Sequence, residues 1–360
     1  MGMAMARHLK PTRLVLLGTP GSMWDVFFER EAEGQVLEQT EQWQMLSDAV
    51  LGEAVTADML QSYSCYLSQR MGMQVECRLI SPARDNEQQL QLLHDLADAI
   101  PQNEILDLDV THSYRHLPML ALVAARYLAR VKGVQVRDIY YGAFDMTDPV
   151  SGETPVVRLG GLLRMLDWVE GLAGYDRDGD YSIFARLLEQ DGLAPQHARL
   201  LQEAAFHERM NNTVRARQSL QSVMPSLQAH TGSMGRLFLA QLLKRLSWFK
   251  EPKRDEQELR LAQASLERRD YLRAAILLQE AVISRDAAWQ SDGIDNFEAR
   301  KQCLKEAEKN DPQVLELSYL RNGMAHTVAP SNKKTFEILK NEATLSSKLR
   351  QLKDHLFSRR

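Results

Sequence analysis

The first half of the chain alternates short apolar runs with segments of helical periodicity. Asn86–Ile100 carries apolar residues at every third or fourth position, and Pro118–Val131 begins with a proline suited to a first helical turn. Four apolar runs are typical of strands: Arg13–Gly18, Gln74–Ile80, Glu104–Asp109 and Val134–Tyr141. Strands that alternate with helices predict a mainly parallel, Rossmann-like sheet covered by helices.

The segment that follows the fourth run predicts a hairpin and then a helix. Phe144–Leu159 contains the turn-forming pairs Asp148-Pro149 and Ser151-Gly152, and helical spacing resumes over Gly161–Leu172. The polar run Asp176–Asp180 has carboxylates at alternate positions, as a calcium loop does. Tyr181 and Leu187 stand where such a loop needs glycine and glutamate, so we interpret the run as an ordinary loop.

From Pro195 onward the strand patterns disappear, and the chain becomes rich in Ala, Leu, Gln, Glu, Arg and Lys. The spacing predicts helices at His197–Met210, Val214–Gln228, Gly232–Ser247, Asp255–Arg268, Asp270–Arg285, Asn296–Lys309, Pro312–His326 and Ser331–Phe357. We therefore expect an α/β plus all-α chain, with an α/β domain over residues 1–175, a linker region over 176–194 and a helical domain over 195–360.

Composition narrows the classes of function. The net charge of −4 argues against a protein that coats nucleic acid through a global basic field, so any such contact must be local. The segment from Ser331 is locally basic, a pattern most often found on a solvated helix face. Three scattered cysteines without a Cys-x-x-Cys pair predict reduced thiols rather than a disulfide or zinc framework.

No segment resembles a membrane anchor. The most apolar window, Met119–Val131, is too short to span a bilayer and contains Arg126 and Arg130. Met1–Lys10 lacks the apolar stretch of a signal peptide. We expect a cytoplasmic protein.

Two polar turns follow predicted strands, at Gly18–Met23 and at Asp109–Arg115. In a parallel α/β sheet ligands bind beyond the carboxyl ends of the strands, so both turns are candidate ligand loops. Gly18–Gly21 lacks the Gly-Lys-Ser/Thr of a Walker loop. Asp107 and Asp109 point to opposite faces of a strand, and we expect Asp109 to order its own loop.

A second candidate site lies on the predicted helix that starts at Asp311-Pro312. Arg321 falls within the apolar stripe of this helix, and a cation there needs an anion. Two interpretations are open: a salt bridge to a carboxylate such as Glu280 or Glu203, or a cleft in which the guanidinium meets a phosphate.

His326 lies five positions after Arg321, about 140° around an ideal helix, so the two side chains do not share a face. Either the helix is disturbed at Gly323, or the cleft is wide and composite.

Taken together, these motifs resemble a known family. Arg321-Asn322 with His326 resembles the Arg-x-x-x-x-His motif of HEPN ribonucleases, and the run from Asp109 to Arg115 resembles the nucleotide-pocket motif of CARF domains. In this order, and over essentially its full length, the chain is similar to the CARF–HEPN effector ribonucleases of type III CRISPR defence.

This resemblance implies a Rossmann-like CARF sensor followed by a helical HEPN domain. In the family, a homodimer combines arginine and histidine from both subunits into one metal-independent site that cleaves single-stranded RNA. Arg321 would stabilise the charged transition state, His326 would transfer a proton or position the ribose hydroxyl, and Asn322 would orient them. No metal, cofactor, DNA or membrane is expected.

The family's activator is a cyclic oligoadenylate, most often cyclic tetra-adenylate, bound across the sensor dimer. The corresponding residues here are Gly18, Thr19, Gly21, Ser22 and Met23 in the first loop, and Asp109, Thr111, His112, Ser113, Tyr114 and Arg115 in the second. Trp24 is either an adenine-stacking residue or part of the core. His112 and Arg115 are either pocket residues or ordinary surface residues.

Two other functions stay open at this point. The first is a non-catalytic nucleotide sensor whose helical half only dimerises or binds a partner. The second is a sensor that also cleaves its own activator, with Thr111, Ser113 or His112 positioning a ribose hydroxyl.

Overall fold

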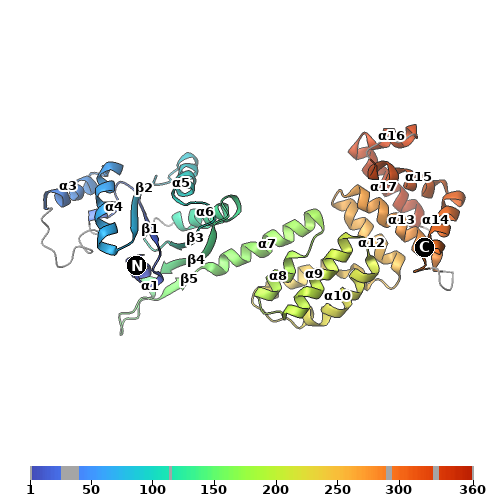
Figure 1. The fold of residues 1–360 in the computed structure, drawn as a ribbon, viewed down its shortest axis with the longest axis horizontal. Helices are drawn as coiled ribbons and strands as arrows, with labels where there is room; N and C mark the ends of the chain where they lie inside the picture. The colour runs from blue at the N-terminus through green and yellow to red at the C-terminus, as the bar shows by residue number, and fades with distance from the viewer. Residues whose placement is uncertain (1, 26–39, 113–115, 289–293, 327–331, 359–360) are drawn as a thin grey trace. The chain divides into compact units, whose positions relative to one another are not determined.

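The computed structural model describes residues 2–25, 40–112, 116–288, 294–326 and 332–358 (Figure 1). The chain divides into two compact units, Met1–Arg164 and Met165–Arg360. The first is an α/β unit and the second is helical, so the predicted change of class along the chain is confirmed.

The strands of the first unit lie where the sequence predicts them. β1 (Arg13–Gly18) pairs in parallel with β2 (Gln74–Leu79), and β3 (Ile105–Asp109) pairs in parallel with β4 (Gln135–Gly142). The short β5 (Val156–Arg158) adds to β4 in antiparallel orientation, which confirms the predicted hairpin. Among the described residues, hydrogen bonding thus gives two sheets, β1-β2 and β3-β4-β5, instead of one continuous sheet.

A shared apolar cluster connects these two sheets. Val15 of β1 and Leu106 of β3 both pack against the same buried residues, which include Ile100 and Leu128. Each sheet therefore contributes at least one side chain to a common apolar cluster.

The part of the first unit that the structure describes contains the helices α1 (Gly2–Leu9), α3 (Thr40–Leu51), α4 (Ala57–Met71), α5 (Asn86–Ala99) and α6 (Leu117–Val131). Asp85 caps α5 by accepting a hydrogen bond from the amide of Gln88. α5 and α6 match the sequence predictions.

The second unit contains α7 (Gly160–Asp178), which begins in the first unit, followed by α8 (Ile183–Gln190), α9 (Pro195–Arg209), α10 (Thr213–Gln228), α11 (Gly235–Arg245), α12 (Arg254–Glu267), α13 (Tyr271–Ala287), α14 (Phe297–Asn310), α15 (Pro312–Ala325), α16 (Lys333–Leu339) and α17 (Glu342–Phe357). Their buried faces form one large apolar core. The predicted helix over Ser331–Phe357 is two helices, because Asn341 interrupts it and caps α17 through the amide of Thr344.

The predicted linker region over 176–194 is part of this helical unit. Trp168 and Tyr175 of α7 and Phe184 of α8 are buried in its core. Since these side chains pack with the helices that follow, the division of the chain lies at residue 164 instead of 175.

Within the described residues, none of the helices combines the length and the apolarity that crossing a membrane requires.

Candidate functional site

The loop after β1 is a tight turn stabilised by its own polar groups. The amide of Ser22 donates to the carbonyl of Thr19 at 3.0 Å, and the amide of Thr19 donates to Ser22 Oγ at 2.8 Å. Thr19 is buried, Gly21 lies against Glu53, and the side chain of Met23 is exposed. The two hydroxyl groups therefore stabilise the turn, and Met23 is the side chain of this loop that faces solvent.

Trp24 belongs to the core of the first unit. Its side chain is only 5% exposed, and its indole nitrogen donates to the carbonyl of Thr19 at 2.9 Å. A Cβ atom at Gly18 would lie 2.5 Å from the Trp24 ring, so the glycine makes room for the indole. The suggestion that Trp24 stacks on adenine is therefore wrong for this structure, because burial leaves no face for a ligand.

The loop after β3 is ordered by Asp109, as the sequence predicts. Asp109 Oδ1 accepts a hydrogen bond from the Thr111 amide at 2.9 Å and another from the Thr111 hydroxyl. Thr111 Oγ1 also accepts from the amide of Gly142 at 2.8 Å. Thr111 thus ties the loop after β3 to the end of β4, and its hydroxyl is engaged both as donor and as acceptor.

His112, the next residue, is exposed and lies beside a side chain that the sequence analysis did not select. Its ring centroid is 5.5 Å from that of Phe144, with 40° between the ring planes. Phe144 starts the short 3-10 turn Phe144–Met146 that follows β4. No sequence motif marks this pair, because the two residues are 32 positions apart and meet only through the pairing of β3 with β4. The other predicted residues of this loop, Ser113, Tyr114 and Arg115, lie outside the described residues.

Arg321 on α15 is half-buried beside the fully buried Leu317 and Leu320. Its Nη1 donates to Asn322 Oδ1 at 2.8 Å, and its Nε is buried without a hydrogen-bond partner among the described residues. An unpartnered buried N–H of a cation is costly, and an anionic oxygen placed next to it would remove that cost.

Neither salt bridge considered from the sequence is formed. Glu280 pairs with Arg300 at 2.6 Å, and Glu203 is exposed on α9. The contact of Arg321 is instead with a neutral amide, which leaves its positive charge uncompensated by a carboxylate in the part of the chain that the structure describes.

His326 ends the same helix. α15 continues without a break through Gly323, so the suggested disturbance at this glycine is wrong. His326 is the C-cap residue, its side chain is exposed, and its amide donates to the Asn322 carbonyl at 3.1 Å. Asn322 therefore contacts Arg321 through its side chain and His326 through its backbone, while the two side chains lie on different faces of the helix.

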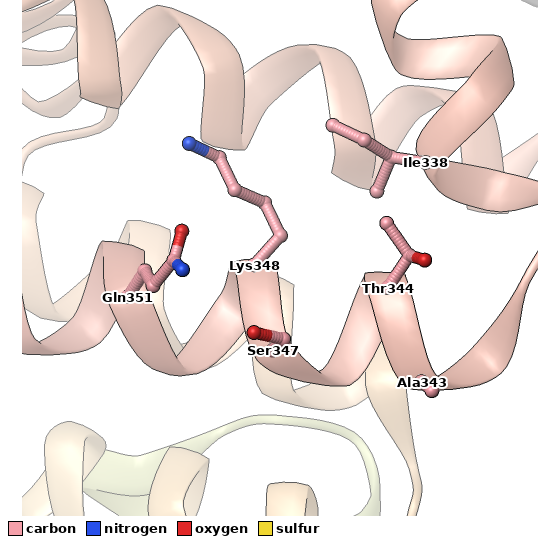
Figure 2. Close-up of a pocket in the computed structure, with 6 residues that line it drawn as sticks. All are labelled: Ile338, Ala343, Thr344, Ser347, Lys348 and Gln351. Atoms are coloured by element: carbon pink, nitrogen blue, oxygen red, sulfur yellow. The ribbon is translucent and has the colours of Figure 1, made fainter.

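A groove of about 420 Å³ lies nearby in sequence, between α16 and α17. Figure 2 shows Thr344 and Lys348 projecting from α17 toward the same side, with Ile338 of α16 facing Thr344. Ser347 and Gln351 of α17 also line the groove. The polar side chains are an amine, an amide and two hydroxyls, which can donate hydrogen bonds to phosphate or sugar oxygens.

Lys348, the amine in this groove, forms an ion pair with a carboxylate of α15. Lys348 Nζ lies 2.7 Å from Glu316 Oε2, and Lys334 Nζ lies 2.8 Å from Glu316 Oε1. Burial of Glu316 would raise its pKa, but the two lysines paired with it outweigh burial and lower the pKa. Two ammonium groups on one carboxylate leave a local positive charge next to the helix that carries Arg321.

Among the described residues, no group of three or more His, Cys, Asp or Glu side chains is placed to hold a metal ion.

No protein-family model matches the chain. Over 296 residues it is 23% identical to the CRISPR-associated protein MJ1674 of Methanocaldococcus jannaschii, a match that spans 77% of this chain and 46% of that protein. The chain is thus related to a CRISPR-associated protein. It covers less than half of the length of this relative.

Proposed function

We propose that the chain is an endoribonuclease that a cyclic oligoadenylate activates, with single-stranded RNA as substrate. The main support for this proposal is the environment of the Arg321 guanidinium. Its Nε is buried without a hydrogen-bond partner among the described residues, and its Nη1 donates to the neutral side chain of Asn322. The likeness to a CRISPR-associated protein and the α/β unit that precedes the helical unit support the proposal.

The chemistry follows from what these side chains offer. A guanidinium stabilises the negative charge that develops on a phosphodiester when a ribose 2′-hydroxyl attacks it. An imidazole such as that of His326 can take up the proton of the 2′-hydroxyl or deliver a proton to the leaving 5′-oxygen. This reaction breaks the bond to the 5′-oxygen of the next nucleotide and leaves a cyclic phosphate on the upstream fragment, without a metal-activated water.

Because Arg321 and His326 of one chain lie on different faces of α15, we propose that two copies of the chain combine their residues in one site. Exposed apolar side chains on α6 support self-association: Met119, Val123, Tyr127 and Val131 follow one another at intervals of four residues. Such an apolar stripe on a surface helix is typical of protein–protein contacts.

A non-catalytic sensor is the second candidate, and the exposed position of His326 favours it, since no described contact holds the imidazole against Arg321. In that case the helical unit would only dimerise or bind a partner.

An RNA cleavage assay with and without each cyclic oligoadenylate separates these functions. We expect cleavage of single-stranded RNA only when an activating ring is present, unchanged by EDTA, with cyclic phosphate ends. Ring binding measured by calorimetry without any cleavage would favour the non-catalytic sensor. If no ring binds and no RNA is cut, both proposals are wrong.

A further inference from the structure

We propose that His112 and Phe144 form an aromatic platform that stacks on a purine base of the activator. This inference rests on the proposed function, because it takes the ligand to be a cyclic oligoadenylate. The rings are 5.5 Å apart, both are exposed, and 51% of the Phe144 side chain is open to solvent.

The backbone that carries Phe144 is held in place before any ligand arrives. The amide of Ala143, a buried residue, donates to the Pro155 carbonyl at 3.0 Å across the hairpin. The carbonyl of Phe144 accepts from the Thr147 amide at 3.1 Å and from the Thr147 hydroxyl at 2.6 Å. An exposed ring on a fixed backbone loses little conformational freedom on binding, which favours affinity.

The two rings are also held relative to each other. Thr111, next to His112, accepts a hydrogen bond from the amide of Gly142, two residues before Phe144. Both rings therefore lie beyond the carboxyl ends of the neighbouring parallel strands β3 and β4, the edge at which α/β sheets bind their ligands.

The chemistry of this edge favours a base over a phosphate or a carboxylate. Asp109 carries a negative charge here, and the Thr111 hydroxyl is already engaged with Asp109 and with Gly142. The exposed pair presents two aromatic faces, and a nucleobase can stack on such a face because every base has a π-face of its own. Trp24, one of whose two interpretations from the sequence was adenine stacking, is buried, and Phe144 supplies the stacking instead.

Calorimetry with cyclic tetra-adenylate tests the platform in the full-length protein. Phe144→Ala should weaken binding about 5- to 150-fold, the range that stacking of one base on an aromatic side chain provides. Phe144→Trp should retain wild-type affinity, and quenching of the new indole fluorescence should accompany binding. Val150→Ala, in the same hairpin and 95% exposed, is the matched control and should bind as the wild type does.

The outcomes separate this inference from the proposed function. Unchanged affinity in Phe144→Ala, with tight binding by the wild type, overturns the platform and leaves the sensor intact. Equal losses in the alanine and tryptophan variants overturn stacking as the role of Phe144. Failure of the wild type to bind any cyclic oligoadenylate overturns the sensor and the platform together.

Discussion

Thr111→Val isolates the hydrogen bonds that join the loop after β3 to the end of β4. Valine keeps the shape of threonine but removes the hydroxyl that donates to Asp109 and accepts from the Gly142 amide at 2.8 Å. Thr111→Ser is the matched control, since serine retains that hydroxyl. We expect the valine variant to loosen this edge of the sheet and the serine variant to leave it nearly unchanged.

The expected size follows from these contacts. A hydrogen bond to a charged group contributes about 1.5–3 kcal/mol, and an unpaired buried amide costs about 1–3 kcal/mol. Asp109 is exposed, so water replaces its hydrogen bond at little cost. The Gly142 amide is buried, so the cost of leaving it unpaired, about 1–3 kcal/mol with a midpoint near 2, sets the size of the effect. A local loss of about 2 kcal/mol corresponds to roughly 30-fold easier opening.

Hydrogen exchange at the Gly142 amide measures this opening directly. In Thr111→Val the amide should exchange roughly 30-fold faster than in the wild type, and affinity for cyclic tetra-adenylate should fall because both candidate pocket rings flank this contact. Equal exchange rates at Gly142 in the wild type and in Thr111→Val would show that the Thr111 hydroxyl does not hold this loop to the end of β4.

Two further predictions concern the first unit. Trp24→Phe removes the donor to the Thr19 carbonyl and should lower the free energy of unfolding by about 1 kcal/mol or more. The affinity for cyclic tetra-adenylate should not change. If the variant melted at the wild-type temperature but bound the ring more weakly, Trp24 would be a ligand-binding residue. Burial would raise the pKa of Asp138, but hydrogen bonds from Arg158 and from the amides of Ile139 and Gly160 outweigh it and lower the pKa. A lowered carboxylate pKa adds stability that is present above the unfolded value of about 3.9 and is lost as pH falls through the folded value. Thermal melts of Asp138→Asn should therefore lie below those of the wild type at neutral pH, and the gap should narrow on acidification; a constant gap down to strongly acidic pH would contradict this assignment.

Much of the fold follows from local sequence signals. The four main strands are apolar runs bounded by turn residues, and helices such as α5 and α15 start at aspartates that accept hydrogen bonds from the first turn. α3 and α4 were not predicted. The linker region was mistaken because a polar run at Asp176–Asp180 looks like a domain boundary, although the apolar residues on both sides of it pack into one core.

The candidate sites were predictable only in part. Helical spacing placed Arg321 beside Leu317, in agreement with its half-buried side chain, but sequence does not reveal which carboxylates are already paired. The burial of Trp24 and the meeting of Phe144 with His112 depend on tertiary packing, for which the sequence carries no local signal.

The most direct test of the account is the rate of ring-activated RNA cleavage by Arg321→Ala. Because the guanidinium is proposed to stabilise the transition state, its removal should lower the rate on the order of a hundredfold or more, while cyclic tetra-adenylate binding and the melting temperature stay near wild type. Lys305→Ala, which removes an exposed cation from the neighbouring α14, is the control and should cleave normally. Wild-type cleavage rates in Arg321→Ala, or complete loss of wild-type activity in EDTA, would contradict the account and place the reaction elsewhere in the chain.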